Sequence, residues 1–137
     1  MSKGRILCTE DDQDTREMLV LFLQDYGYEV VCSADGKQTL DLVDGENFDL
    51  FLFDNWLPEI SGVDLTLRIR QFNKTTPILF YSGAATEEEQ RSALEAGAQA
   101  YLIKPIGIEE LVQAIERLIS ESNASAAGQP DCQGGSN

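Results

Sequence analysis

The sequence predicts an α/β fold in which a parallel five-stranded sheet lies between two layers of helices. Short apolar runs alternate five times with segments of helical periodicity, the pattern of a parallel sheet with right-handed crossover connections. The third apolar run, residues 48–53, is apolar nearly throughout, as expected of a central strand that is covered on both faces. The 137 residues suit one such domain with a substantial core.

Local signals place the individual elements. We expect strands at about residues 5–9, 28–32, 48–53, 77–81 and 100–103, and helices at about residues 14–26, 36–43, 63–72, 86–97 and 108–120. Gly27 and Gly97 are placed to end two helices, and Thr86 and Glu89 form a capping box that begins the fourth. From about residue 121 the chain is rich in Ser, Ala, Gly and Gln without an apolar period. We therefore expect a domain of residues 1–120 and a disordered tail or linker of residues 121–137.

Composition disfavours several classes of function. The formal net charge of −14 argues against contact with nucleic acid or with an anionic membrane. The absence of histidine excludes histidine-based catalysis, histidine metal ligation and a phosphohistidine carrier role. No apolar run is long enough for a transmembrane helix. The three cysteines, Cys8, Cys32 and Cys132, show no metal-ligand spacing, and two lie in apolar runs, so we expect a reducing, cytoplasmic setting.

Polar residues follow the expected strands at the edge of a parallel sheet where ligands bind. Glu10 and Asp11 follow the first strand, Asp54 the third, Ser82 the fourth and Lys104 the fifth. Adjacent acids need a compensating cation, and Mg²⁺ prefers carboxylates, water and phosphate oxygens. An aspartate can also act as a nucleophile that forms an acyl phosphate, while Lys104 and Ser82 offer donors to phosphoryl oxygens. Each residue alone has an ordinary explanation as a cap or a turn, but their joint position predicts one phosphoryl-binding pocket.

The chain resembles the receiver domain of two-component response regulators over about residues 3–120. The matching stretches are residues 6–12 with Arg16, then 49–54, 57–62, 77–83, 97–98 and 101–105. The order and spacing of these motifs make the resemblance specific. It implies a flavodoxin-like (βα)5 three-layer sandwich with the strand order 2-1-3-4-5.

The resemblance also implies the parts of a phosphoryl-transfer site. Asp54 matches the phosphoacceptor, and Lys104 matches the lysine that holds the phosphoryl group. Glu10 and Asp11 match the acid pair that binds Mg²⁺, for which Mn²⁺ is expected to substitute, and the backbone carbonyl of Trp56 matches a further metal ligand. Glu10 stands where many relatives have Asp. The bulky Trp56 either changes the lifetime of phospho-Asp54 or covers apolar atoms of its loop.

Switch residues and partners follow from the same resemblance. Ser82 matches the switch hydroxyl and Tyr101 the switch aromatic, although Tyr101 can also be an ordinary strand aromatic. The phosphoryl donor would be a sensor histidine kinase or a phosphotransfer protein, and a downstream protein would bind the face of the fourth helix, fifth strand and fifth helix. Met18 and Phe22 flank the core stripe of the first helix, where they either dock the donor protein or widen the buried stripe.

We expect a phosphorylation-controlled signalling switch rather than a conventional enzyme, with Mg²⁺-dependent self-phosphotransfer and autodephosphorylation at Asp54. It would be a stand-alone receiver or a piece of a longer protein. One alternative is a receiver-fold interaction module that is not controlled by phosphorylation. Another is a flavodoxin-like or Rossmann-type enzyme, which would need a glycine-rich phosphate loop where this chain has the acidic residues 10–12.

Overall fold

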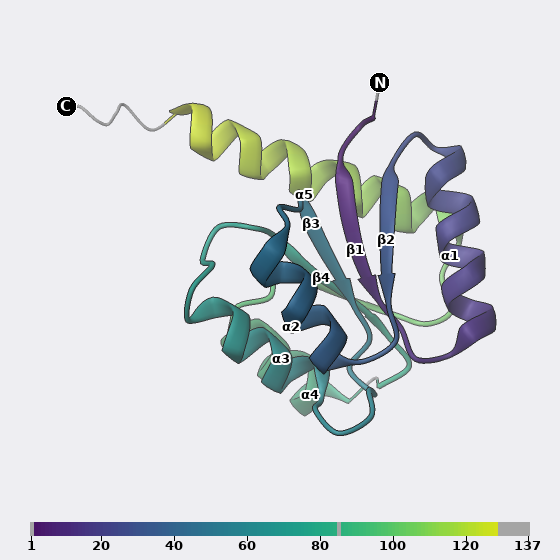
Figure 1. Cartoon of the computed structure of the whole chain (residues 1–137), viewed down its shortest axis with the longest axis vertical. Coiled ribbons are helices and arrows are strands. Elements are labelled where there is room, and N and C mark those ends of the chain that lie inside the picture. The colour runs from purple at the N-terminus through teal and green to yellow at the C-terminus, as the bar shows by residue number, and fades with distance from the viewer. Residues whose placement is uncertain (1, 85, 129–137) are drawn as a thin grey trace.

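In the computed structural model, which describes residues 2–84 and 86–128, five parallel strands form one sheet in the order β2-β1-β3-β4-β5 (Figure 1). The strands are β1 (Arg5–Thr9), β2 (Glu29–Ser33), β3 (Leu50–Phe53), β4 (Ile78–Ser82) and β5 (Ala100–Ile103). The predicted flavodoxin-like fold and strand order are therefore confirmed. Thr9 pairs with Ser33 on one side and with Phe53 on the other, so the carboxyl ends of β1, β2 and β3 adjoin.

Five helices cover the two faces of this sheet (Figure 1). They are α1 (Gln13–Asp25), α2 (Gly36–Gly45), α3 (Gly62–Arg70), α4 (Glu87–Ala96) and α5 (Ile108–Gly128). Alternate strand residues face opposite layers: Ile6 and Leu50 pack with α1 and α5, whereas Leu7 and Phe51 pack with the layer of α2, α3 and α4. Both faces of the central strands are thus buried, which explains their nearly continuous apolar sequences.

The starts of β2 and β3 differ from the prediction, and specific backbone bonds accompany both differences. Gly27 has a φ of 102° and follows the C-cap residue Tyr26, and the amide of Tyr28 returns to the carbonyl of Leu23. This closing turn uses Tyr28, so β2 begins one residue later than expected. At β3, the amide of Asp49 binds the Arg5 carbonyl, and the strand proper begins at residue 50 instead of 48.

The predicted end of the last helix at residue 120 is wrong, because α5 continues to Gly128. The added segment has no apolar period, but it contains three alanines and no proline, so nothing in it stops a helix. Residues 129–137 of the expected tail, with Cys132, lie outside the described residues, and the domain boundary near residue 120 stays a prediction. None of the helices in the described part combines the length and apolarity that crossing a membrane requires.

Candidate functional site

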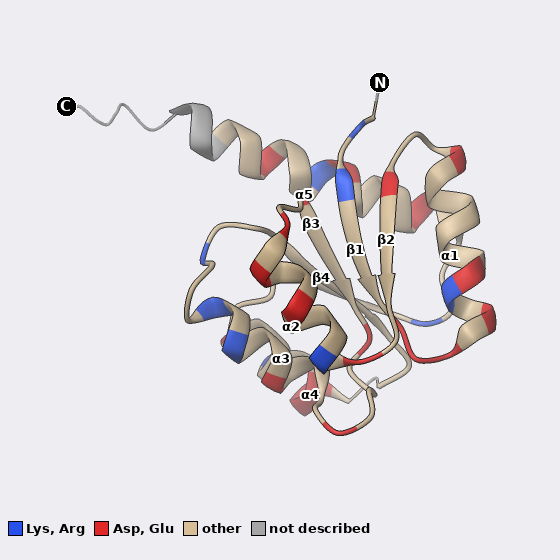
Figure 2. Ribbon diagram, in the orientation of Figure 1, with Lys and Arg blue, Asp and Glu red and all other residues tan. Residues whose placement is uncertain are grey.

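Acidic residues gather at the carboxyl edge of the sheet, where β1 runs into α1 (Figure 2). Glu10, Asp11 and Asp54 each offer a carboxylate oxygen, and these three atoms lie within 4.8 Å of one another. Lys104 Nζ lies 2.5 Å from Glu10 Oε1 and 3.1 Å from Asp54 Oδ2. Ser82 Oγ donates to Asp54 Oδ1 at 2.7 Å. The five side chains singled out in the sequence therefore lie in one cluster.

Two of the three carboxylates are buried, whereas Asp11 is exposed. Glu10 is 3% and Asp54 6% exposed. Burial raises the pKa of Glu10 in spite of the hydrogen bond from Lys104. Burial alone would lower the pKa of Lys104, but its hydrogen bond to Glu10 and the attraction of Asp54 outweigh that effect and raise it. One ammonium group thus stands against three carboxylates, and the excess negative charge favours a bound cation.

Backbone bonds between neighbouring strands hold the acids in place. The amide of Asp54 binds the Thr9 carbonyl at 3.1 Å, and the amide of Glu10 binds the Ser33 carbonyl at 3.0 Å. The loop after β3 is packed tightly, because a Cβ atom on Gly62 would lie 2.5 Å from the Asp54 carbonyl oxygen. The backbone positions of Glu10 and Asp54 are therefore fixed by these bonds and by close packing.

The carboxylate cluster offers the oxygen donors that Mg²⁺ prefers. Mg²⁺ takes oxygen ligands at about 2.1 Å in octahedral geometry, so ligands on opposite sides of the ion lie about 4.2 Å apart. The oxygens of Glu10, Asp11 and Asp54 lie within 4.8 Å of one another, which is compatible with binding to one such ion. The Trp56 amide donates to Asp54 Oδ1 at 3.1 Å, which places this residue beside the cluster. The expected role of the Trp56 carbonyl as a ligand stays a prediction.

The two expected switch residues already face the site. Ser82 is buried and bonded to Asp54, and the Tyr101 hydroxyl donates to the Ala84 carbonyl at 2.5 Å. The ring of Tyr101 stacks on Phe80 with centroids 5.4 Å apart, and burial raises the pKa of its hydroxyl. Both side chains therefore point inward, Ser82 toward Asp54 and Tyr101 toward the loop after β4.

Trp56 is 61% exposed, and its ring lies against Gly83, where a Cβ atom would come within 3.3 Å of it. The ring therefore spans from the loop after β3 to the loop after β4, at the rim of the carboxylate cluster. This position fits either of the roles expected for Trp56.

The first helix divides its apolar residues as expected. Leu19 and Leu23 are buried, whereas Met18 and Phe22 are 42% and 44% exposed. The two exposed residues line a groove of about 220 Å³ with Ile106, which precedes α5, and with residues in the first turn of α5. The alternative of a wide buried stripe does not hold at these two positions, and a role in docking stays a prediction.

Some residues of the site carried no clear sequence signal. The Arg16 guanidinium donates to the carbonyls of Glu10 and Asp11, at 2.8 and 3.3 Å, and so fixes the turn that bears both acids. Thr39 in α2 binds hydroxyls at the ends of β1 and β2, directly below the same turn. Arg16 lay in a matched motif but had no assigned role. The role of Thr39 could not be predicted from the sequence, because its contacts depend on how α2 packs on the sheet.

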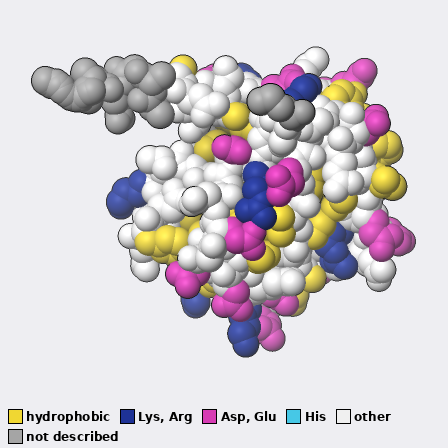
Figure 3. Space-filling view, turned by 45° about the horizontal axis from the view of Figure 1, so that its top comes forward, with side chains coloured by type: hydrophobic (Ala, Val, Ile, Leu, Met, Phe, Trp, Pro, Cys, Tyr) yellow, Lys and Arg dark blue, Asp and Glu magenta, His cyan; other side chains and the backbone are white. Residues whose placement is uncertain are grey.

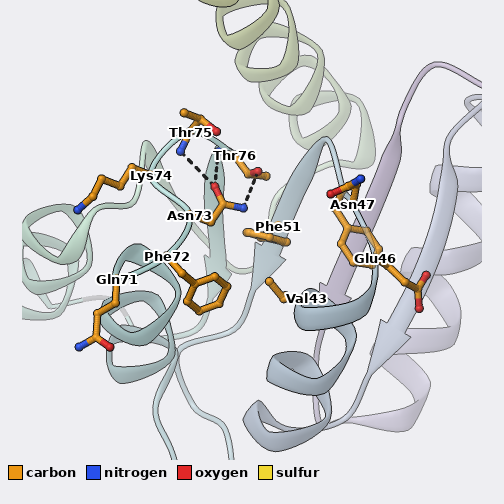
Figure 4. A pocket seen from close by; sticks show the side chains of 11 residues that line it. Val43, Glu46, Asn47, Phe51, Gln71, Phe72, Asn73, Lys74, Thr75 and Thr76 are labelled. Atoms are coloured by element: carbon orange, nitrogen blue, oxygen red, sulfur yellow. Dashed lines mark hydrogen bonds between the residues drawn. The ribbon is translucent and has the colours of Figure 1, made fainter.

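A larger cavity of about 600 Å³ lies at the opposite, amino edge of the sheet, between the end of α2 and the loop after α3 (Figure 4). Phe72 points into this cavity, and Asn73 binds Thr75 and Thr76 at its margin (Figure 4). None of the residues that line this cavity belongs to the carboxylate cluster.

Acidic and basic side chains lie next to one another on the face of the molecule that Figure 3 shows.

Comparison with known proteins gives consistent matches. A family model described as the response regulator receiver domain matches residues 6–116. The alkaline phosphatase synthesis transcriptional regulatory protein SphR of Synechococcus elongatus is 36% identical over 136 residues, which cover 93% of this chain and 53% of that protein. The transcriptional regulatory protein CpxR of Escherichia coli is 33% identical over 131 residues, or 96% of this chain and 56% of CpxR.

Solved structures agree with these matches. The crystal structure of a CheY-like response regulator receiver domain protein from Methanospirillum hungatei has a TM-score of 0.87 at 30% identity, over 90% of this chain and 99% of the other. The chain spans about half the length of the curated relatives that it matches.

Proposed function

We propose, because this chain belongs to the response regulator receiver domain family, that Asp54 accepts a phosphoryl group from a sensor histidine kinase or a phosphotransfer protein. The observation that carries the proposal is the position of Asp54, which is buried beside two other acids and contacts both Lys104 and Ser82. The protein is then a phosphorylation-controlled switch that assists its own phosphorylation and dephosphorylation.

The chain's own residues supply positions for each part of the transfer. A carboxylate oxygen of Asp54 forms a bond to phosphorus while the bond from phosphorus to the donor's imidazole nitrogen breaks, and the electron pair leaves with the imidazole. Lys104, 3.1 Å from Asp54 Oδ2, stands where it can hold a phosphoryl oxygen. Ser82, now bonded to Asp54 Oδ1, can donate to a second phosphoryl oxygen. These donors stabilise charge on the phosphoryl group during transfer.

We propose Mg²⁺ as the required cation, with Mn²⁺ as a substitute, held by Glu10, Asp11, Asp54 and the Trp56 carbonyl. When bound, the metal neutralises the carboxylates and the phosphoryl oxygens. Support comes from the donor chemistry and the spacing of the three carboxylate oxygens. Lys104 alone cannot balance the charge of the cluster once a phosphoryl group is added.

The switch connects Asp54 to the surface of α4, β5 and α5. Ser82 and Tyr101 are linked to the loop after β4, since Tyr101 binds the Ala84 carbonyl and Ser82 accepts from the Ala84 amide. A phosphoryl group that takes the Ser82 hydroxyl would stabilise this inward arrangement. Leu94 on α4 and Ile103 on β5 leave apolar area exposed on that face, where we propose that a downstream protein binds.

We further propose that the phosphoryl donor docks on the groove beside Met18 and Phe22, whose lining includes Tyr81 and Ile106, which are close in sequence to the site residues Ser82 and Lys104. A net charge of −14 makes direct nucleic-acid binding by this domain unfavourable.

Phosphorylation by acetyl phosphate, followed by intact mass, tests the proposed function. With Mg²⁺ we expect one added phosphoryl group on the parent chain and none on Asp54→Asn. Chelation of the metal is expected to abolish the adduct as well. An unmodified parent chain under these conditions would favour the alternative, a receiver-fold interaction module that phosphorylation does not control. An adduct on Asp54→Asn would place the acceptor elsewhere.

A further inference from the structure

We propose that the Thr39 hydroxyl is a positioning group for Glu10 and Asp54, which it aligns through buried hydroxyls at the ends of β1 and β2. The proposal rests on the function proposed above, since it concerns the geometry of the same site. Thr39 lies on α2 and does not contact either acid itself. Its effect is therefore on the placement of the acids and not on the reacting atoms.

Three buried hydroxyl groups form a closed hydrogen-bond network below the acid turn. Thr39 Oγ1 lies 2.6 Å from Thr9 Oγ1, 2.9 Å from Ser33 Oγ and 2.9 Å from the Asp35 carbonyl oxygen. Ser33 Oγ in turn donates to the Asp35 carbonyl at 2.7 Å. If Thr9 donates to Thr39, Thr39 to Ser33 and Ser33 to Asp35, all three protons have acceptors. Thr39 is the central member of this network.

The two strand residues of the network also hold the backbones of the acids. Thr9 and Ser33 are directly paired across β1 and β2. The Thr9 carbonyl accepts the Asp54 amide at 3.1 Å, and the Ser33 carbonyl accepts the Glu10 amide at 3.0 Å. A shift of either strand end would therefore move one acid relative to the other.

The acid cluster needs such a restraint because its like charges repel. The carboxylates of Glu10, Asp11 and Asp54 lie within 4.8 Å of one another at the ends of β1 and β3. Their repulsion tends to separate the ends of β1 and β3. The neutral hydroxyl network fixes the end of β1 to β2 and α2, and β1 in turn holds the Asp54 backbone through the Thr9 carbonyl. Mg²⁺ requires nearly ideal octahedral geometry, so a small separation of the acids weakens its binding.

Three variants distinguish positioning from simple packing. Thr39→Val keeps the size of the side chain and removes the hydroxyl, while Thr39→Ser keeps the hydroxyl. Thr66→Val is the matched control, because Thr66 is equally buried and bonds the Gly62 carbonyl four residues earlier in its own helix, as Thr39 bonds Asp35. In the described structure, the Thr66 hydroxyl has no bond to β1 or β2.

Two measurements report on the site without phosphorylation. The first is Mg²⁺ titration, followed by the fluorescence of Trp56, the single tryptophan of the chain. The second is hydrogen exchange at the amides of Glu10 and Asp54 in metal-free protein. Loss of outer-shell partners typically weakens metal binding by 10- to 100-fold. Thr39 does not bond the acids directly but acts through Thr9 and Ser33. We therefore expect a smaller effect, about a 3- to 10-fold weaker Mg²⁺ affinity in Thr39→Val.

Both amides should exchange faster in Thr39→Val, while Thr39→Ser and Thr66→Val should stay close to the parent in both measurements. Parent-like values for Thr39→Val, or an equal loss in Thr66→Val, would overturn the proposal. If Thr39→Val does not fold, Ser33→Ala removes another hydroxyl of the network and is measured in its place. Failure of the parent to bind Mg²⁺ would count against the proposed function, whereas the exchange measurement judges the positioning without any metal.

Discussion

Asp11 is the residue whose charge we expect to destabilise the metal-free protein most clearly. Its carboxylate is exposed and has no ion pair within residues 2–84 and 86–128, yet it lies within 4.8 Å of the carboxylates of Glu10 and Asp54. Lys104 pairs with those two acids but not with Asp11, so it offsets only part of the repulsion that Asp11 meets. Replacing Asp11 by Asn should therefore raise the free energy of unfolding in the absence of Mg²⁺.

The size of the effect follows from the distance. Two unit charges 4.8 Å apart repel by about 3.5 kcal/mol at an effective dielectric constant of about 20, and by about 0.9 kcal/mol in bulk water. Since Asp11 is exposed, each repulsion lies near the lower value, and the Lys104 ammonium beside both acids offsets roughly one of the two, so we expect a gain of about 1 kcal/mol. For a domain of this size that corresponds to a rise of about 4 °C in Tm.

Thermal and urea unfolding with a chelator measure the gain directly. Asp41→Asn is the matched control, because Asp41 is an exposed acid on α2 outside the cluster, and its Tm should stay close to that of the parent. At saturating Mg²⁺ the order should reverse, since the parent gains binding energy that Asp11→Asn loses. A lower or unchanged Tm for Asp11→Asn without metal would refute the account of like-charge repulsion.

Three further predictions follow from the same structure. Gly62→Ala should destabilise the fold by about 2 kcal/mol or more through overpacking, as judged by urea unfolding, while Gly45→Ala, which has open space, should not. Burial raises the pKa of Tyr28 to about 12, above its value of about 10 in the unfolded chain. Its contribution to stability should therefore be full below about pH 10 and fall as pH rises toward 12, a loss that Tyr28→Phe should lack in unfolding measured against pH. Trp56→Ala should change the decay rate of phospho-Asp54 followed by intact mass, and equal rates in both proteins would leave Trp56 only a covering role.

The sequence predicted the placement of the acids well because strand ends in a parallel sheet share one edge. Glu10 and Asp54 each follow an apolar run, so their meeting required only the correct strand order. The end of α5 was predicted wrongly because no apolar pattern marks it. A segment of small polar residues and alanines carries no apolar period, and its helix extends from a helix already formed by packing.

The hydroxyl network could not be predicted from the sequence, because it depends on contacts between separate elements. Thr9, Ser33 and Thr39 fit no motif in their own segments. Their hydroxyls come within hydrogen-bond distance only because α2 packs closely on β1 and β2. Their hydrogen bonds join three elements, whereas a local pattern reports on one.

In the proposed function, charge balance at the carboxylate cluster would connect the metal, the phosphoryl group and the switch. Three carboxylates and one ammonium leave a formal charge of about −2, and phosphorylation of Asp54 adds up to about one further negative charge, because a phosphoryl group carries −1.5 to −2 in place of one carboxylate charge. The added oxygens must then find donors, and the groups at hand are Lys104 and the Ser82 hydroxyl. A divalent cation offsets most of this charge, so its removal should destabilise the phosphorylated protein more than the unmodified one. Ser82 would then be held inward by the same charges that would hold the metal, and Tyr101 would follow through the loop after β4.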